Sequence, residues 1–137
     1  MRVLALDYGS ARCGVAVSDP TGTLATPLEA VTRAATRRGL DRIATVVRET
    51  DAQRVVVGLP LSLSGGDSAQ TAEARAFAER LERRLGAEVP VELYDERFTT
   101  RIAQRSGSSR SSEDSRAAAV LLEDWLAAHG PGDHPAD

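Results

Sequence analysis

Three places in the sequence carry acidic side chains where an apolar pattern ends or is interrupted. Asp7 closes the apolar run that follows Arg2, the pair Asp95-Glu96 closes a later strand-like segment, and Asp114 stands just before an Ala-rich segment. A carboxylate at the end of a buried strand needs a partner, a metal ion or open solvent, because a buried unpaired charge is costly. If the chain brings these carboxylates together in one cleft, they would suit a metal site.

The position of Asp114 is the most informative of the three. Steps of four and then three or four residues lead from Asp114 to a set of apolar positions, Ala118, Leu121, Leu122 and Trp125. On a helix these positions share one face, so Asp114 falls on the stripe that points to the core. An acidic residue in the first turn also stabilises a helix through its dipole, although Glu113 alone would do so. Helix capping therefore stays open as an alternative.

The other acidic positions also have purely structural interpretations. Asp7 could initiate the tight turn that follows it, and Asp95 and Glu96 could be solvated residues at the end of a strand. Alternation along that strand places Glu96 on the face of Glu92 and Tyr94, and Asp95 on the other face. Alternation often fails where a strand ends, so it does not choose between the two.

Arginine side chains gather next to the acidic pair. Arg97, Arg101 and Arg105 recur every four residues, and residues 97–112 contain four arginines and no acid. Such a block of positive charge beside carboxylates suits a nucleic-acid backbone that approaches a metal site. A solvated helix face is the alternative, and the use of arginine for all 17 basic residues is also what a GC-rich genome produces.

Charge, cysteine and histidine content narrow the classes of function. The chain carries 17 basic and 20 acidic residues, a net charge of −3, so contacts to nucleic acid must be local. Its one cysteine, Cys13, excludes an intrachain disulfide framework and a cysteine-based zinc site, and suits a reducing compartment. Both histidines, His129 and His134, lie in the C-terminal segment, which makes a Ser-His hydrolase triad a poor candidate. No stretch approaches the roughly 18 apolar residues of a membrane span, so a cytoplasmic protein is expected.

The elements that must position these residues follow from the hydrophobic pattern. Strands are predicted over residues 2–7, 14–18, 24–31, 54–58 and 89–94, and helices over 40–47, 68–85, 100–105 and 113–128. The all-apolar segment 54–58 is typical of a buried parallel strand, and Pro27 favours an edge position for 24–31. This order predicts an α/β fold with a mixed five-stranded sheet flanked by helices on both faces. The 137 residues fit one domain over 1–128 and a flexible tail over 129–137.

Several segments resemble, in order, the YqgF/RuvX family. They are Asp7-Tyr-Gly-Ser-Ala-Arg-Cys-Gly-Val-Ala-Val-Ser-Asp19, Val56-Val-Gly-Leu-Pro-Leu61, Asp95-Glu-Arg-Phe-Thr-Thr100, and Asp114 ahead of its Ala-rich helix. The likeness runs from residue 2 to about residue 127. The family is similar in fold to ribonuclease H and the RuvC resolvases, and is described as resolving Holliday junctions or maturing the 5′ end of pre-16S rRNA. The resemblance therefore implies a ribonuclease H-like nuclease that hydrolyses phosphodiester bonds.

Matched residue by residue, the acidic triad of the family falls on Asp7, Glu96 and Asp114, and the resemblance alone favours Glu96 over Asp95. It implies Mg²⁺ or Mn²⁺ as cofactor, as two ions about 4 Å apart that stabilise the attacking and leaving oxygens. Asp7 would bridge the ions, and Glu96 and Asp114 would hold one each. Carboxylate oxygens suit these hard ions.

In such a mechanism the nearby arginines Arg12, Arg97 and Arg101 would position phosphates, and Arg110 is a further candidate for binding nucleic acid. This chain departs from the family at two loops. It has Ser62-Leu-Ser64 where an Asn and an acidic residue are usual, and the segment 106–112 before Asp114 is rich in serine rather than in Lys and Arg.

Two other classes stay open at this point. Asp-x-Gly at a first strand turn also occurs in actin-like nucleotide-binding proteins of related fold, but those need two such domains. A ribosome-binding or nucleic-acid-binding module without catalysis is the other alternative. The residues do not choose between pre-rRNA and branched DNA, nor between a monomer and a homodimer, and no membrane partner is expected.

Overall fold

The structure, a computed structural model, describes residues 1–9, 11–59, 69–95 and 110–129, with the backbone alone at 95 and 110–114. The helix predicted over 100–105 and the tail from residue 130 lie outside these residues. The described elements are β1 (Val3–Asp7), β2 (Arg12–Ser18), β3 (Ala25–Thr32), α1 (Arg37–Thr50), β4 (Arg54–Leu59), α2 (Ala69–Leu85), β5 (Val91–Asp95) and α3 (Arg110–His129).

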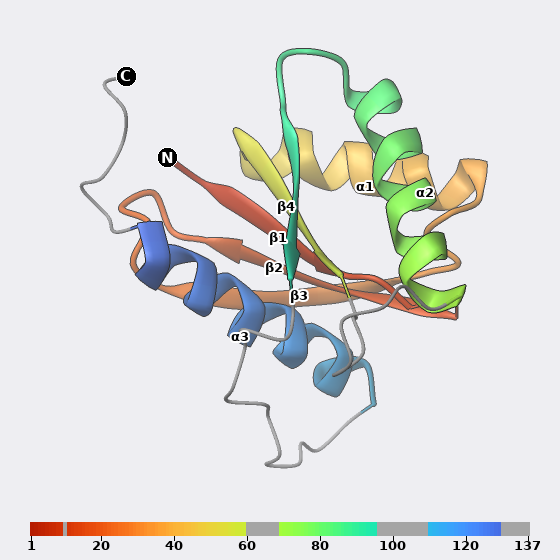
Figure 1. The fold of residues 1–137 in the computed structure, drawn as a ribbon. Coiled ribbons are helices and arrows are strands. Elements are labelled where there is room, and N and C mark those ends of the chain that lie inside the picture. The colour runs from red at the N-terminus through yellow and green to blue at the C-terminus, as the bar shows by residue number, and fades with distance from the viewer. Residues whose placement is uncertain (10, 60–68, 96–109, 130–137) are drawn as a thin grey trace.

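The strands form one mixed sheet in the order β3-β2-β1-β4-β5 (Figure 1). Strand β2 runs antiparallel to both β1 and β3, whereas β4 runs parallel to β1 and β5. The prediction of a mixed five-stranded sheet is confirmed. Strand β3 carries Pro27 and lies at an edge, as expected, because a proline cannot donate a ladder hydrogen bond.

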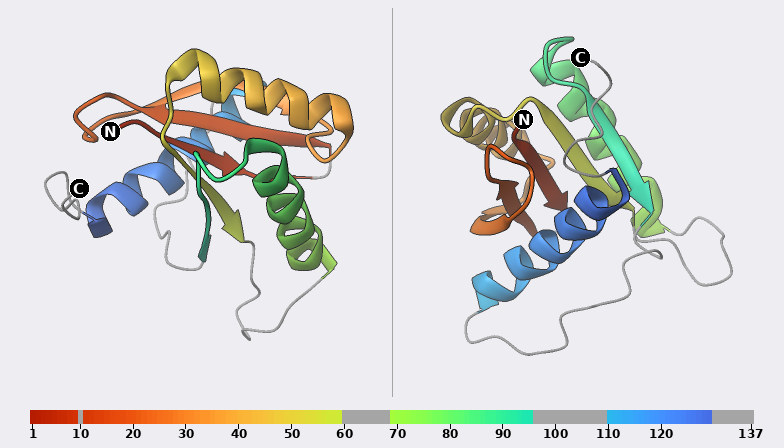
Figure 2. Two further views of the ribbon diagram at one scale, coloured as in Figure 1. Left: turned by 90° about the horizontal axis from the view of Figure 1, so that it is seen from above. Right: turned by 90° about the vertical axis from the view of Figure 1, so that its left-hand side faces the viewer.

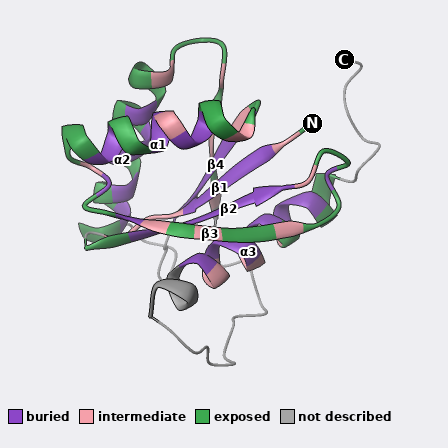
Figure 3. Ribbon diagram, turned by 180° about the vertical axis from the view of Figure 1, so that it is seen from behind, coloured by how far each residue is buried: buried purple, intermediate pink, exposed green. Residues whose placement is uncertain are grey.

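Helices cover both faces of the sheet. Helices α1 and α2 lie on one face and α3 lies on the other (Figures 1 and 2). In β1, Leu4 and Leu6 belong to the core under α1 and α2, whereas Val3 and Ala5 belong to the core under α3. Figure 3 shows the central strands buried and edge strand β3 largely exposed. A strand covered on both faces needs a nearly continuous apolar run, which is the pattern of residues 3–6 in β1 and 55–59 in β4.

The helices begin and end at residues that hydrophobic periodicity does not reveal. The Thr36 hydroxyl caps α1 by accepting a hydrogen bond from the Gly39 backbone N–H at 3.1 Å, so this helix starts before the predicted residue 40. Helix α2 ends before Gly86, whose φ of 83° is the left-handed conformation expected after a helix. Helix α3 ends at His129, one residue beyond the domain end predicted at 128. No helix in the described part of the chain is long and apolar enough to cross a membrane.

Candidate active site

The carboxyl ends of the three parallel strands lie at one edge of the sheet. Strand β1 ends at Asp7, β4 at Leu59 and β5 at Asp95. Leu59 pairs with Asp95, so β4 lies between the two acidic strand ends. With neighbouring strands about 4.8 Å apart, the backbones of Asp7 and Asp95 are separated by about 10 Å. Segments that follow parallel strands at such an edge are where α/β proteins commonly build their sites.

Asp7 is half-buried and pairs with Gly14 of β2. It has the same alternation as Val3 and Ala5, which contact the core under α3. Its residue position is therefore on the α3 face of the sheet. The predicted placement of Asp7 at the end of a central strand is confirmed.

The first turns of α3 are joined to the sheet by a buried serine, Ser115. Between Cys13 and Val15 the pairing of β2 with β3 shifts, because Cys13 pairs with Val31 but Val15 pairs with Leu28. Strand β3 thus contains one extra residue, a β-bulge. The Ser115 hydroxyl sits at this irregularity, accepting a hydrogen bond from the Val15 N–H at 3.3 Å and donating one to the Leu28 carbonyl oxygen.

The contact between Ser115 and Val15 links the backbone next to Asp114 with the backbone next to the partner of Asp7. Ser115 follows Asp114 directly in α3, while Val15 follows Gly14, the residue that pairs with Asp7. The backbone of α3 at Asp114 is thus fixed beside the strand pair that carries Asp7. The side chain of Asp114 is outside what the structure describes, and the predicted core stripe that continues from it is buried, at Ala118, Leu121, Leu122 and Trp125.

The remaining predicted site residues fall in different places. Arg12 is exposed and begins β2, opposite Thr32 of β3. Arg110 begins α3, with only its backbone described. Glu96, Arg97 and Arg101 lie outside the described residues, so their roles stay predictions.

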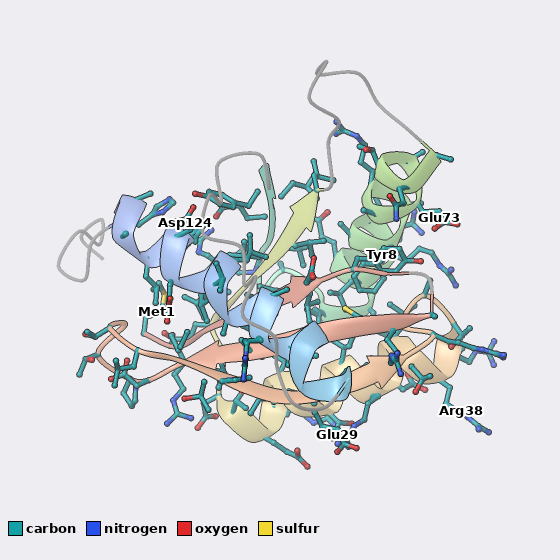
Figure 4. All side chains as sticks on the ribbon, turned by 90° about the horizontal axis from the view of Figure 1, so that it is seen from below. Met1, Tyr8, Glu29, Arg38, Glu73 and Asp124 are labelled. Atoms are coloured by element: carbon teal, nitrogen blue, oxygen red, sulfur yellow. The ribbon has the colours of Figure 1, made fainter. Side chains whose placement is uncertain are left out.

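Tyr8 anchors the turn that follows Asp7. Its ring stacks on Phe77 of α2, with centroids 4.7 Å apart and planes 24° apart. Burial raises the pKa of the Tyr8 phenol, and the nearby Glu73 carboxylate raises it further. Tyr8, labelled in Figure 4, is thus a neutral packing group at physiological pH because its pKa is raised.

Neither Tyr8 nor Ser115 is singled out by the sequence patterns considered above. The available signal for Ser115 was its place in a helical series with Ala119, Leu122 and Leu126, where a polar residue needs a partner. The structure supplies that partner in the backbone of β2 and β3.

The donor chemistry at this edge suits a hard divalent cation. Asp7 offers carboxylate oxygens, the ligand type that Mg²⁺ and Mn²⁺ prefer. Within the described residues, no three His, Cys, Asp or Glu side chains form a group that could hold a metal ion. Two further acidic side chains of the predicted triad, Glu96 and Asp114, are not among those described.

Comparison with protein families and curated proteins gives a consistent result. A family model described as RuvX, Holliday junction resolvase, matches residues 1–128. A relative from Thermobifida fusca is 48% identical, over 90% of this chain and 85% of its own length. A relative from Anaeromyxobacter sp. is 42% identical, over 92% of this chain and 96% of its own. Both are named as candidate pre-16S rRNA nucleases.

Solved structures with the same fold come from resolvases. Thermus thermophilus RuvC matches with a TM-score of 0.61 at 18% identity, over 94% of this chain and 96% of that one. The same protein in complex with a Holliday junction substrate matches with a TM-score of 0.60 at 19% identity, over 97% of both chains. At this level of identity the likeness concerns the fold, and it confirms the predicted ribonuclease H-like architecture.

Proposed function

This chain belongs to the RuvX family, described as Holliday junction resolvases, and on that premise we propose that it is a metal-dependent nuclease. It would hydrolyse phosphodiester bonds of structured nucleic acid, either at the 5′ end of pre-16S rRNA or in a Holliday junction. The observation that carries the proposal is the contact of Ser115 with Val15. It supports a site in which α3 brings Asp114 to the strand pair that ends in Asp7.

Asp7, Glu96 and Asp114 form the catalytic triad in this proposal. The choice of Glu96 over Asp95 rests on the family resemblance, and the alternation of the described residues of β5 agrees with it. Glu92 accepts a hydrogen bond from Trp125 of α3, and Tyr94 packs against the core under α3. Glu96 has the same parity as these two residues and as the α3 face on which Asp7 lies.

These three carboxylates would hold Mg²⁺ or Mn²⁺, as two ions. When bound, the ions supply electrostatic stabilisation of the negative charge that develops on the attacking and leaving oxygens. The chain's own contribution is positioning. Strand β1 places Asp7 at the carboxyl end of the central strand. Ser115 joins the first turns of α3 to the sheet, and the stacking of Tyr8 on Phe77 holds the turn after Asp7. Arg12, Arg97, Arg101 and Arg110 would contact phosphates and set the position of the substrate without reading its sequence.

The wider setting belongs to the same proposal. The nuclease domain would comprise residues 1–128, with a tail over 129–137. Its partner is nucleic acid, with a ribosome precursor as the setting for an rRNA substrate, and it would act in the cytoplasm as a monomer or a homodimer. A dimer would let two sites cut the two strands of a junction.

The test compares cleavage of a four-way DNA junction with cleavage of an RNA that carries the 5′ precursor segment of 16S rRNA, in Mn²⁺ and in EDTA. Asp7→Asn and Asp114→Asn should each reduce the rate at least ~100-fold, since a metal ligand contributes several kcal/mol. Asp124→Asn is the matched control, because Asp124 is on the same helix at the opposite end of the sheet from Tyr8 (Figure 4).

Cleavage that persists in EDTA would contradict a metal-dependent mechanism. Binding of both nucleic acids without cleavage of either would favour a non-catalytic binding module. Preference for one of the two substrates would settle which nucleic acid this protein processes.

A further inference from the structure

A groove of about 590 Å³ lies between the end of β3 and the start of α1. We refer to it as the arginine groove, because three of its lining residues are arginines. Its lining consists of Glu29, Ala30, Val31, Thr32, Arg33, Thr36, Arg38, Gly39 and Arg42. Arg33 follows β3 directly, and Arg38 and Arg42 are one turn apart on the exposed face of α1.

The backbone brings these arginines together by a close approach. A Cβ atom at position 39 would collide with the carbonyl oxygen of Arg33, so glycine lets the first turn of α1 pack directly on the segment after β3. The Thr36 hydroxyl, which caps α1, also donates a hydrogen bond to that carbonyl oxygen at 2.8 Å. This backbone turn thus places the positions of the three arginines around the same groove.

The arginine groove is positive in a protein of net negative charge. It holds three arginines and one acid, Glu29, whereas the whole chain carries −3. Two arginines elsewhere are neutralised, Arg54 by Glu92 at 3.0 Å and Arg84 by Asp41 at 2.8 Å. Within the described part of the chain, the side chains of Arg33, Arg38 and Arg42 form no such ion pair. Their charge is therefore available to an external anion.

The groove lies next to the candidate active site. The Arg33 backbone N–H donates to the carbonyl oxygen of Ala11 at 3.0 Å, and Arg12 pairs with Thr32. Residues 11 and 12 lie at the start of β2, the strand that pairs with β1 up to Asp7. Figure 4 shows Tyr8 and Arg38 toward one end of the sheet, with Met1 and Asp124 at the other. A polymer lying across the end of β1 could continue over the start of β2 into this groove.

The chemistry of the lining identifies the ligand class. Three of the nine lining residues are arginines and one is acidic, so the charge of the lining favours an anionic ligand. Arginine presents a planar fork that binds phosphate oxygens in pairs. The groove is open and, at about 590 Å³, larger than one phosphate ion needs. We propose that the arginine groove binds successive phosphates of a nucleic-acid backbone beside the site of cleavage.

This inference rests on the proposed nuclease function and adds a substrate-binding surface to it, on the side of the sheet covered by α1. The contacts are to phosphate, so they position the strand and carry no sequence preference. DNA and RNA both offer this chemistry, and binding measurements on each can separate them.

The test compares two double variants that each remove two arginines from exposed helix positions. The groove variant, Arg38→Ala with Arg42→Ala, removes two of the three arginines that line the groove. Arg48→Ala with Arg83→Ala is the matched control, because these residues lie in the last turns of α1 and α2. Alanine is the strongest helix former, so both variants should fold.

Binding of a four-way DNA junction and of an RNA stem-loop is measured in EDTA, which prevents cleavage, between about 50 and 200 mM salt. The groove variant should bind more weakly. Its plot of log affinity against log salt should be shallower by roughly 0.9 for each duplex DNA phosphate that the variant no longer neutralises. The control variant should match the wild type. Weaker binding of one nucleic acid alone would assign the groove to that backbone.

Suppose that the wild type binds and cleaves nucleic acid but the groove variant binds as tightly as the control variant. That result would overturn this inference and leave the proposed nuclease function standing. Equal weakening by both variants would also overturn it, since it would show a general charge effect. A wild type that neither binds nor cleaves either nucleic acid would overturn both the inference and the proposed function.

Discussion

The hydroxyl oxygen of Ser115 lies 3.3 Å from the backbone nitrogen of Val15, a residue 100 positions earlier in the chain. The same hydroxyl donates to the carbonyl oxygen of Leu28, so one side chain satisfies two backbone groups at the β-bulge between β2 and β3. This contact joins the first turns of α3 to the sheet, where the apolar core of the helix does not reach. In the proposed site, it also fixes the distance between Asp7 and Asp114.

Ser115→Ala should destabilise the protein by about 1–3 kcal/mol, because it leaves buried backbone groups without a partner. Cleavage should fall further than the reduced stability explains, while binding of nucleic acid in EDTA stays close to that of the wild type. Urea unfolding, cleavage well below the melting temperature and binding measure these three quantities. Equal weakening of binding and cleavage would show that Ser115 has a structural role alone.

Asp114→Asn should remove cleavage and leave the metal-free protein at least as stable as the wild type. In the proposed triad, like charges repel when no metal is bound, and the amide relieves that repulsion without supplying a full negative charge. Helix capping predicts the opposite, a destabilisation of about 0.5–1 kcal/mol with activity retained. Thermal melts in EDTA and cleavage in Mn²⁺ separate the two interpretations.

Glu92→Ala should loosen the contact between β5 and α3. One oxygen of Glu92 pairs with Arg54 at 3.0 Å and the other accepts from the Trp125 indole at 3.1 Å. These groups are about one-third exposed, so the ion pair contributes modestly, and a total cost of about 1–2 kcal/mol is expected. Trp125 is the single tryptophan of the chain, so its fluorescence reports directly on this contact. An unchanged emission spectrum of Trp125 in the Glu92→Ala variant would argue against the contact between Glu92 and Trp125.

Asp19 should make stability depend on pH in acid. The hydroxyl of Thr21 and the backbone N–H groups of Leu24 and Thr23 hold the pKa of this carboxyl well below its usual range. The pKa is lower in the folded state, so the stabilisation is complete above the unfolded value of about 3.9 and is lost as the pH falls toward the folded value. Asp19→Ala should therefore unfold at lower urea concentration at pH 7, and the difference from the wild type should shrink at pH 3. A constant difference would contradict this assignment.

The sequence was sufficient to predict those helices and strands that a pattern within one segment reveals. The strands β1, β4 and β5 and the core stripe of α3 are continuous or periodic apolar patterns, which a single pass along the chain reveals. Helix α1 begins at Arg37, three residues before the predicted start at residue 40. Its start depends on the Thr36 cap, which hydrophobic periodicity does not detect.

Contacts between distant segments could not be predicted in this way. Ser115 appears as an ordinary serine in the sequence, and its role depends on a bulge in the pairing of β2 with β3. Arg33 joins Arg38 and Arg42 only because Gly39 permits a close backbone approach. For the triad, alternation allowed either Asp95 or Glu96, and the resemblance alone made the choice.

The position of α3 also has a consequence for biosynthesis. Strands β1, β2 and β3 are made first and pair with their neighbours along the chain. Among the described helices, α3 alone covers the apolar face that contains Val3, Ala5 and Ala16. A nascent chain therefore carries an uncovered sheet face until the residues of α3 have been made. It also lacks Asp114 until then, so the proposed nuclease stays inactive for as long as α3 is missing.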